Sequence, residues 1–426
     1  MANGNFGGGS GAPGDPYLVE DFADLDAVRN DLEAHYKQTA NIDMDGETWD
    51  PIGNRNSPHF TGEYDGDGFL IQNLTIDVDP ANVHEQALFQ SVHGTLKNIH
   101  LRNASVKAGW GSGTLVAWTP HVASGILIEH CSATGTLESP EGNGGGLVGN
   151  FNGGVIRHCW ADVDVDGTGG TRYGGLIGAT GWREMLIEKC YALGDVKGGN
   201  PMWGSGEVGG FIGYTDWSTT VKECFAKGDV EAFHDVGGFA GSLDGPAENC
   251  YATGDVHILD NEESDGRGGG FCGTNGQDLK HCYAFGVVTS DRTAPLLGGL
   301  TGGNWGEIID CYYNRDANGP TNFLGVAIPE ASLKEGVPGE PVGGETLSGS
   351  VLHFAQPWNR TVTWDKAILW EEGAPPSVGD QHTAHAIQFS YVRDPHQQEY
   401  WFAKVKKFIP KPESGPAVID GGGVNT

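Results

Sequence analysis

The sequence predicts an all-β fold, a parallel β-solenoid built from coils of about thirty residues. A cysteine recurs seven times at roughly this interval and is followed in six copies by an aromatic residue. A glycine-bounded apolar segment recurs with the same period. The apolar runs between the glycines are short and rich in β-branched and aromatic side chains, which is typical of strands and not of helices. A fixed period of this length indicates a stack of like units.

Each coil is predicted to contain three short strands. The repeating cysteines are Cys131, Cys159, Cys190, Cys224, Cys250, Cys282 and Cys311. The glycine-bounded segments are residues 145–149, 174–178, 209–213, 237–241, 269–273 and 298–302. A coil then has a glycine-bounded strand, a turn, a strand ending in Cys-aromatic-Ala and a tail of the form Gly-Asp-Val. Seven coils spaced about 4.8 Å apart give a shaft of about 34 Å.

The segments that flank the repeat predict caps, because the end coils of a solenoid expose unpaired strand edges. Residues 21–36 place Phe22, Leu25, Val28 and Leu32 at helical spacing, with acidic residues at the start. We therefore expect a helical N-terminal cap and an irregular C-terminal cover. The expected division is a flexible arm over 1–14, the cap over 15–59, the shaft over 60–312 with its regular repeats over 113–312, the cover over 313–376, and a hairpin and extended tail over 377–426.

The composition excludes several partners. The formal net charge is -31, from 56 Asp and Glu against 25 Lys and Arg. Nucleic acid needs a basic footprint, so no nucleic-acid partner is expected. No apolar run approaches the roughly eighteen residues of a membrane span, so no membrane insertion is expected either. The first residues have neither a basic segment nor an apolar run, and we expect no leader peptide.

The stacked cysteines allow two interpretations. A spacing of about 4.8 Å between coils lies within the range of a disulfide, so pairing stays open. Free, buried thiols that act as small apolar spacers are the favoured interpretation, because synthesis in the cytosol without a leader keeps cysteines reduced.

Several motifs resemble a known repeat. The segment Gly-Gly-Leu-Val-Gly at 145–149 and the segment Cys-Tyr-Ala-Thr-Gly-Asp-Val at 250–256 resemble the GLUG repeat. Trp-Asp-Pro-Ile-Gly at 49–53 and Tyr-Tyr-Asn at 312–314 are similar to flanking motifs of GLUG-containing surface proteins. The resemblance covers roughly residues 14–376. It implies a β-solenoid that occurs in adhesins, in virus particles and as an appendage of surface enzymes, and the sequence has no catalytic motif of an associated peptidase.

The aromatic residues after the cysteines form one candidate site. If Cys190 faces inward, the alternation of side chains along a strand turns Tyr191 outward. The equivalent positions then make an outward ladder of Trp160, Tyr191, Phe225, Tyr251, Tyr283 and Tyr312. Such a ladder would stiffen the shaft or lie under a covering segment, or it would offer a docking strip for sugar rings or for another protein.

Acidic residues form a second candidate site. The same alternation places Asp164, Asp195, Asp229 and Asp255 in a ladder beside the rings. These carboxylates would either stand in solvent or be bridged by a cation such as Ca²⁺. The loop that contains Asp260, Glu262 and Asp265 is a second oxygen-rich candidate for Ca²⁺. Residues 162–167 match a calcium loop only superficially, because Tyr173 occupies the place of the closing Glu.

These features predict a non-enzymatic, exposed structural or host-binding component of a virus particle, such as a tail fibre, a spike or a capsid decoration. Other virion proteins would hold it through its termini, its ligand would be a host surface glycan or protein, and homo-oligomer formation stays open. A cell-surface adhesin is the first alternative. A polysaccharide-degrading enzyme is the second. Pairs of carboxylates are no signal for it, because any acidic solenoid offers such pairs by chance.

Overall fold

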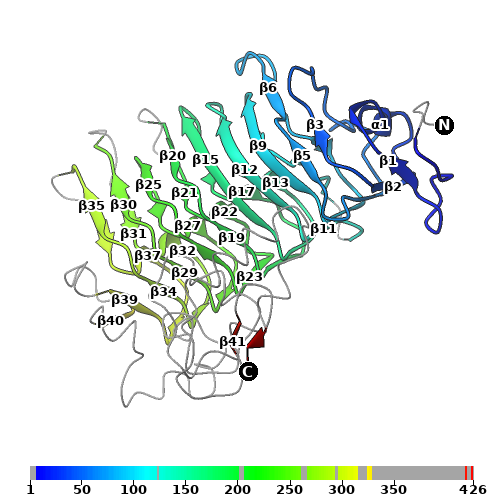
Figure 1. Cartoon of the computed structure of the whole chain (residues 1–426). Helices are drawn as coiled ribbons and strands as arrows, with labels where there is room; N and C mark the ends of the chain where they lie inside the picture. Colours follow the sequence, from blue (N-terminus) through cyan, green and yellow to red (C-terminus); the bar gives the residue numbers. More distant parts are fainter. Residues whose placement is uncertain are drawn as a thin grey trace.

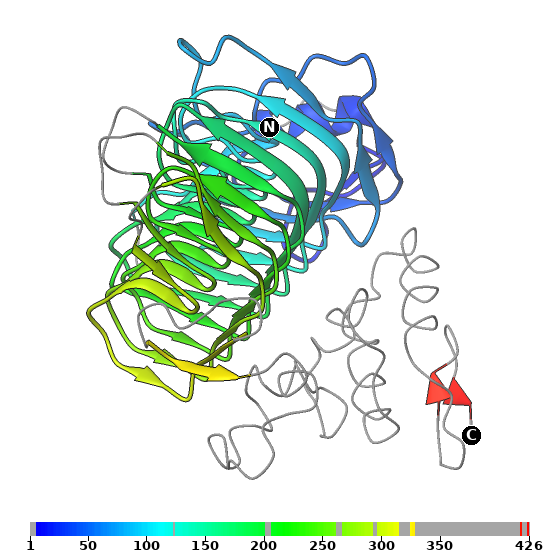
Figure 2. The same cartoon turned by 90° about the vertical axis from the view of Figure 1, so that its left-hand side faces the viewer.

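A computed structural model describes residues 6–121, 124–200, 206–260, 266–292, 296–314, 324–328, 418–419 and 424–425. The chain winds into a parallel β-solenoid, which confirms the predicted fold class. Equivalent strands of successive coils lie side by side along one axis (Figure 1). The N-terminal coils lie at one end of the shaft and the last described coils at the other (Figure 2).

Sheets 1 and 2 form two sides of the coils. Sheet 1 has 11 strands in the order β1 (Tyr17–Val19), β2 (His35–Gln38), β4 (Glu63–Asp65), β8 (Thr95–Lys97), β11 (Leu127–Glu129), β14 (Gly154–Arg157), β18 (Met185–Glu188), β23 (Thr219–Lys222), β28 (Ala247–Glu248), β33 (Leu279–Lys280) and β38 (Ile308–Ile309). Sheet 2 has 8 strands, β7 (Phe89–Ser91), β10 (Val116–Trp118), β13 (Val148–Phe151), β17 (Ile177–Thr180), β22 (Ile212–Thr215), β27 (Ala240–Leu243), β32 (Cys272–Asn275) and β37 (Thr301–Asn304). In a coil the chain passes from sheet 2 to sheet 1.

Two further sheets complete the coils. Sheet 3 has 16 strands, β3 (Ile42–Asp43), β5 (Leu70–Gln72), β6 (Thr75–Asp77), β9 (His100–Lys107), β12 (Ser132–Glu138), β15 (Trp160–Thr168), β19 (Tyr191–Ala192), β20 (Val196–Gly199), β24 (Phe225–Ala226), β25 (Val230–Ala232), β29 (Tyr251–Ala252), β30 (Val256–Ile258), β34 (Tyr283–Ala284), β35 (Val288–Ser290), β39 (Tyr312–Asn314) and β40 (Val326–Ile328). Sheet 4 has 5 strands, β16 (Tyr173–Gly174), β21 (Val208–Gly209), β26 (Val236–Gly237), β31 (Arg267–Gly269) and β36 (Leu296–Gly298). A separate antiparallel pair joins β41 (Val418–Ile419) and β42 (Val424–Asn425).

The interior is a set of side-chain ladders in register. The apolar residue of each glycine-bounded segment stacks on its equivalents, and this ladder consists of Leu147, Leu176, Phe211, Phe239, Phe271 and Leu300. The rings of Phe211 and Phe239 are 4.7 Å apart and those of Phe239 and Phe271 are 4.8 Å apart. The flanking glycines are required by close packing, since a Cβ on Gly238 would lie 2.4 Å from the carbonyl oxygen of Gly270.

The repeating cysteines line the same interior, and all eight cysteines of the chain are free and buried. This confirms the favoured interpretation of free thiols. Each thiol of the ladder donates to a carbonyl two residues earlier, as Cys190 does to Glu188 at 3.2 Å. The residue before each of the seven repeating cysteines turns the corner between sheets 1 and 3 with a positive φ, for example 53° at His130 and 57° at Lys189. Burial raises the pKa of Cys190 and Cys224 well above the ordinary thiol range.

The N-terminal cap differs from the prediction. The helix α1 covers only Phe22–Ala27 and continues as a 3-10 turn over Val28–Asn30. Its start is as expected, because the Asp21 carboxylate accepts the Asp24 amide at 3.0 Å. The predicted helical segment ends early because β2 pairs with β1 and β4, so these residues already belong to the stack. Part of the arm is also paired, since the Gly7 amide donates to the Leu18 carbonyl at 3.0 Å.

The C-terminal predictions lie mostly outside the described residues. Of the expected cover over 313–376, the structure describes 313–314 and 324–328, where β40 adds one more parallel strand to β39. The predicted hairpin, at 386–408, lies outside the described residues, while the predicted extended tail contains the antiparallel pair of β41 and β42. In the helices that the structure does describe, none has the length and apolar character of a membrane span.

Candidate functional site

The predicted aromatic ladder forms, but its rings are buried. Ring centroids of neighbouring coils are 5.7 Å apart for Trp160 and Tyr191, 4.8 Å for Tyr191 and Phe225, and 4.9 Å for Phe225 and Tyr251. The exposed fractions run from 0% at Tyr191 to 7% at Trp160. The ladder faces away from the interior cluster, as alternation predicted.

The side chains of the predicted docking strip are thus buried in the described structure, namely Trp160, Tyr191, Phe225, Tyr251, Tyr283 and Tyr312. Stacking covers the faces of these rings, and the hydroxyl groups of Tyr191 and Tyr251 at the ring edges are buried as well. A ring in the middle of the ladder presents both faces to the rings of neighbouring coils, so no face is accessible to a sugar or to a partner side chain. The stacked faces fit the stiffening role, and the buried ring edges fit a position under a covering segment.

The acidic ladder has a role in the backbone. Each carboxylate accepts the amide of the equivalent turn in the next coil: Asp164 accepts from Asp195 at 3.1 Å, Asp195 from Asp229 at 2.8 Å, and Asp229 from Asp255 at 2.8 Å. Asp255 accepts from Val287 at 2.8 Å. These bonds satisfy amide groups where sheet 3 bends, which explains the Gly-Asp-Val tail of the repeat.

The predicted calcium sites find no support in the structure. Among the described residues, no group of three or more His, Cys, Asp or Glu side chains is arranged to hold a metal ion. Asp164, Asp195, Asp229 and Asp255 instead direct an oxygen to a backbone amide. In the second candidate loop Asp260 is exposed, while Glu262 and Asp265 lie outside the described residues.

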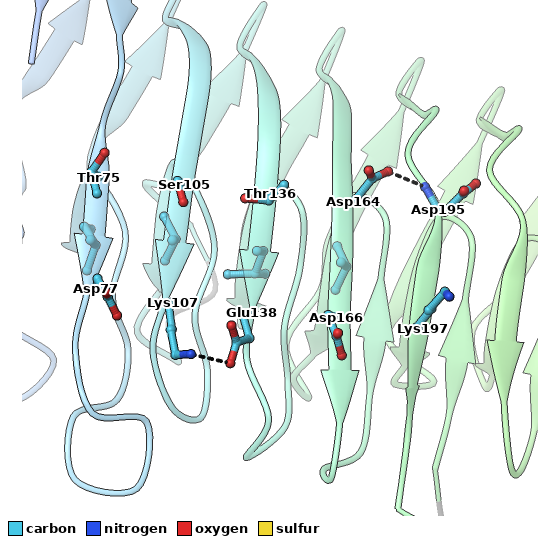
Figure 3. Close-up of a pocket in the computed structure, with 14 residues that line it drawn as sticks. Thr75, Asp77, Ser105, Lys107, Thr136, Glu138, Asp164, Asp166, Asp195 and Lys197 are labelled. Atoms are coloured by element: carbon cyan, nitrogen blue, oxygen red, sulfur yellow. Dashed lines mark hydrogen bonds and ion pairs between the residues drawn. The ribbon is translucent and has the colours of Figure 1, made fainter. Parts of the chain in front are cut away.

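A polar groove crosses the outer face of sheet 3, and it is the first candidate site that the structure assembles (Figure 3). Its volume is about 550 Å³, and it crosses β6, β9, β12, β15 and the start of β20. One row across these strands consists of Thr75, Ser105, Thr136, Asp164 and Asp195. The next row consists of Asp77, Lys107, Glu138, Asp166 and Lys197.

The second row contains two ion pairs between neighbouring strands. Lys107 Nζ lies 2.8 Å from Glu138, and this hydrogen bond raises the pKa of Lys107. Lys197 Nζ lies 4.0 Å from Glu231 on the next coil. Farther along the same row, His257 contacts the hydroxyl of Thr289 at 2.9 Å and the carboxylate of Asp291 at 3.3 Å. The groove thus offers hydroxyls and carboxylates that can hydrogen-bond a polar chain lying across the strands.

The structure also shows exposed tryptophans that sequence reasoning missed. Trp182, Trp217 and Trp305 are 69%, 67% and 66% exposed. All three lie in the turn that leads from sheet 2 to sheet 1. In the sequence, each of these tryptophans stands shortly after a glycine-bounded strand, at a position where the repeat has no consensus residue. A tryptophan at such a position in three coils is the signal that could have identified them.

Comparisons with known proteins show similarity to parts of much larger proteins. Over 258 residues the chain is 29% identical to Halomucin of Haloquadratum walsbyi, and the aligned region covers 56% of this chain and 3% of that protein. Over 181 residues it is 29% identical to a protein of Evansella cellulosilytica provisionally named a Gly-rich membrane protein, covering 41% of this chain and 21% of that one. Over 189 residues it is 25% identical to an immunoglobulin A1 protease of Streptococcus pneumoniae, and the aligned region covers 43% of this chain and 9% of that protein. The chain therefore spans no more than 21% of the length of these relatives.

One solved structure supports the fold. It is provisionally described as an immunoglobulin A1 protease from Bacteroides ovatus, and it aligns with a TM-score of 0.52 and 22% identity over 67% of this chain and 86% of that one. At this identity the likeness concerns the fold alone. No family model matches the chain, so membership of the GLUG family stays a prediction.

Proposed function

We propose that this chain is a non-enzymatic, exposed binding component whose groove on sheet 3 holds a host surface glycan or protein. The observation that carries the proposal is the repetition of hydroxyl and carboxylate side chains across neighbouring strands of the groove. A regular row of hydrogen-bonding groups fits an extended polar chain better than a compact small molecule, which needs an enclosed, largely apolar pocket.

We place the protein in a virus particle, attached to other virion proteins through its termini and outside the cell after assembly. Its long parallel shaft and acidic surface suit an exposed appendage. A cell-surface adhesin is the second candidate, and the relative named a membrane protein favours it. Mass spectrometry and immunogold imaging of purified particles separate the two settings, because an adhesin is absent from particles and present on intact cells.

The groove is tested by removing its hydroxyls. Ser105→Ala combined with Thr136→Ala changes two exposed side chains in the groove and leaves the interior intact. We expect this variant to lose binding to purified host envelope while it keeps its unfolding temperature. Thr95→Ala, which changes a half-buried hydroxyl on sheet 1 outside both grooves, is the matched control and should bind as the parent does. Equal binding by all three proteins would remove the groove from the proposal, and release of reducing ends from host polysaccharide would show an enzyme instead.

A further inference from the structure

A second groove lies on sheet 1, on a different side of the shaft from the groove of sheet 3. Its volume is about 690 Å³, and it crosses β14, β18 and β23. Trp217 stands at its edge with 67% of its surface exposed. An indole exposed beside a groove offers a flat apolar face on which a ligand can pack.

The floor of the groove is aliphatic and its rim is polar. Val155 and Leu186 are half-buried and directly paired across β14 and β18. Thr220 continues the same row on β23. Glu184 and Lys222 are exposed at the rim and carry opposite charges. The groove therefore combines a narrow apolar strip with hydrogen-bonding groups on its sides.

The turn that presents Trp217 is held in place before any ligand arrives. The Asp216 amide donates to the hydroxyl of Thr180 at 2.9 Å. The Asp216 carboxylate accepts the amide of Ser218 at 3.2 Å, and the Ser218 hydroxyl donates to the Arg183 carbonyl at 2.8 Å. Because the turn is already fixed, less conformational entropy is lost when a ligand binds to the Trp217 indole.

We propose that this groove is a subsite for a neutral glycan, with one sugar ring stacked on Trp217. A sugar ring has an apolar face of C–H groups and a rim of hydroxyls. The C–H face fits the indole and the strip of Val155 and Leu186, while the hydroxyls can bond to Glu184, Thr220 and Lys222. A neutral sugar also suits a rim that carries both charges and a chain of net charge -31, which disfavours anionic ligands.

Other ligands fit this groove less well. An extended peptide would need a free strand edge, but β18 is paired with β14 on one side and with β23 on the other. A folded protein partner typically buries about 800 Å² on each side, and a lone indole at the turn between two sheets does not provide so broad an apolar patch.

The test compares two exposed tryptophans in equivalent turns. Trp217→Ala removes the proposed platform, and Trp305→Ala is the matched control, since Trp305 is 66% exposed and is not among the residues that line this groove. The probes are maltohexaose, cellohexaose, mannohexaose and N-acetylchitohexaose, titrated by calorimetry at millimolar concentrations. Unfolding temperatures of both variants should equal that of the parent.

We expect at least one probe to bind the parent, with affinity reduced about tenfold or more in Trp217→Ala and unchanged in Trp305→Ala. Failure of all four probes to bind the parent overturns the inference, as does equal affinity of the parent and Trp217→Ala. Equal loss in both tryptophan variants overturns it too, because it would assign binding to the turns in general. The Ser105→Ala and Thr136→Ala variant keeps this binding if the two grooves act separately.

Discussion

Single side chains link one coil to the next in this protein. The carboxylates of Asp195 and Asp229 each accept a backbone amide from the following coil. Their mutual repulsion is offset by these bonds, which explains why an acidic chain can place a carboxylate at the same position in consecutive coils. The aspartates thus have a structural role in the turn.

Replacement of one such aspartate should have a measurable cost. Asp229→Ala leaves the Asp255 amide without its carboxylate acceptor, and we expect a loss of about 1 kcal/mol of stability. Asp229→Asn keeps an oxygen acceptor and removes a charge, so its unfolding temperature should stay closer to that of the parent. Scanning calorimetry of the three proteins checks this, and identical midpoints for the Ala and Asn variants would contradict the role of the hydrogen bond.

A buried histidine should make stability depend on pH. His100 lies in sheet 3 with its Nδ1 2.7 Å from the hydroxyl of Ser132. Burial lowers the pKa of His100 to about 3, and the charge of His130 acts in the same direction. Histidine in an unfolded chain has a pKa of about 6.5, so between these values the unfolded state binds the proton more readily. The stabilisation is complete above about pH 6.5 and is lost as the pH falls toward 3.

We expect the unfolding temperature of the parent to fall between pH 7 and pH 4, and to fall less in His100→Gln. His93→Gln changes a half-buried histidine in a turn and serves as the control. Thermal unfolding followed by circular dichroism at several pH values gives the three slopes. If His100→Gln and the parent lose stability equally, protonation of His100 is not the cause.

Whole strands are positioned by the ladders inside the shaft. Phe239 packs between Phe211 and Phe271, and coils without Phe at this position have Leu. Phe239→Ala should cost about 3–5 kcal/mol because it leaves a cavity inside the stack. Phe239→Leu should cost about 1.5 kcal/mol or less, since the other coils show that Leu fits. Urea unfolding measures both, and equal costs would show that this ladder is not tightly packed.

The period of the sequence predicts which side chains share a ladder, because residues one period apart become neighbours. It therefore predicted the register of Tyr191 on Phe225. It could not predict that the outer rings are buried, because a period shows which side chains are neighbours along the shaft and not which of them solvent can reach. The helix was predicted too long because local spacing near Tyr36 does not reveal pairing with β4, about thirty residues later. Trp217 was missed because its turn lies outside the repeat.

The molecule as a whole separates support from binding. The interior ladders and the Asp turns repeat in nearly every coil, while the two grooves occupy the outer faces of different sheets. A solenoid is stabilised mainly by contacts between adjacent coils, so its stability should change in steps of one coil. The groove of sheet 1 ends at Lys222, which leaves the following coils without contact to it.

Removal of one complete coil tests this architecture directly. Deletion of residues 225–250 joins Cys224 to Tyr251, so that Tyr251 takes the ladder position of Phe225. In the interior, Phe271 then stacks directly on Phe211. We expect the shortened chain to fold, to be about 4.8 Å shorter by small-angle scattering, and to unfold at a moderately lower temperature. Deletion of residues 225–237, half of the same coil, should prevent folding because it moves every following strand out of register. A half-coil deletion that folds as well as the full-coil deletion would contradict a stack in which equivalent positions of successive coils support one another.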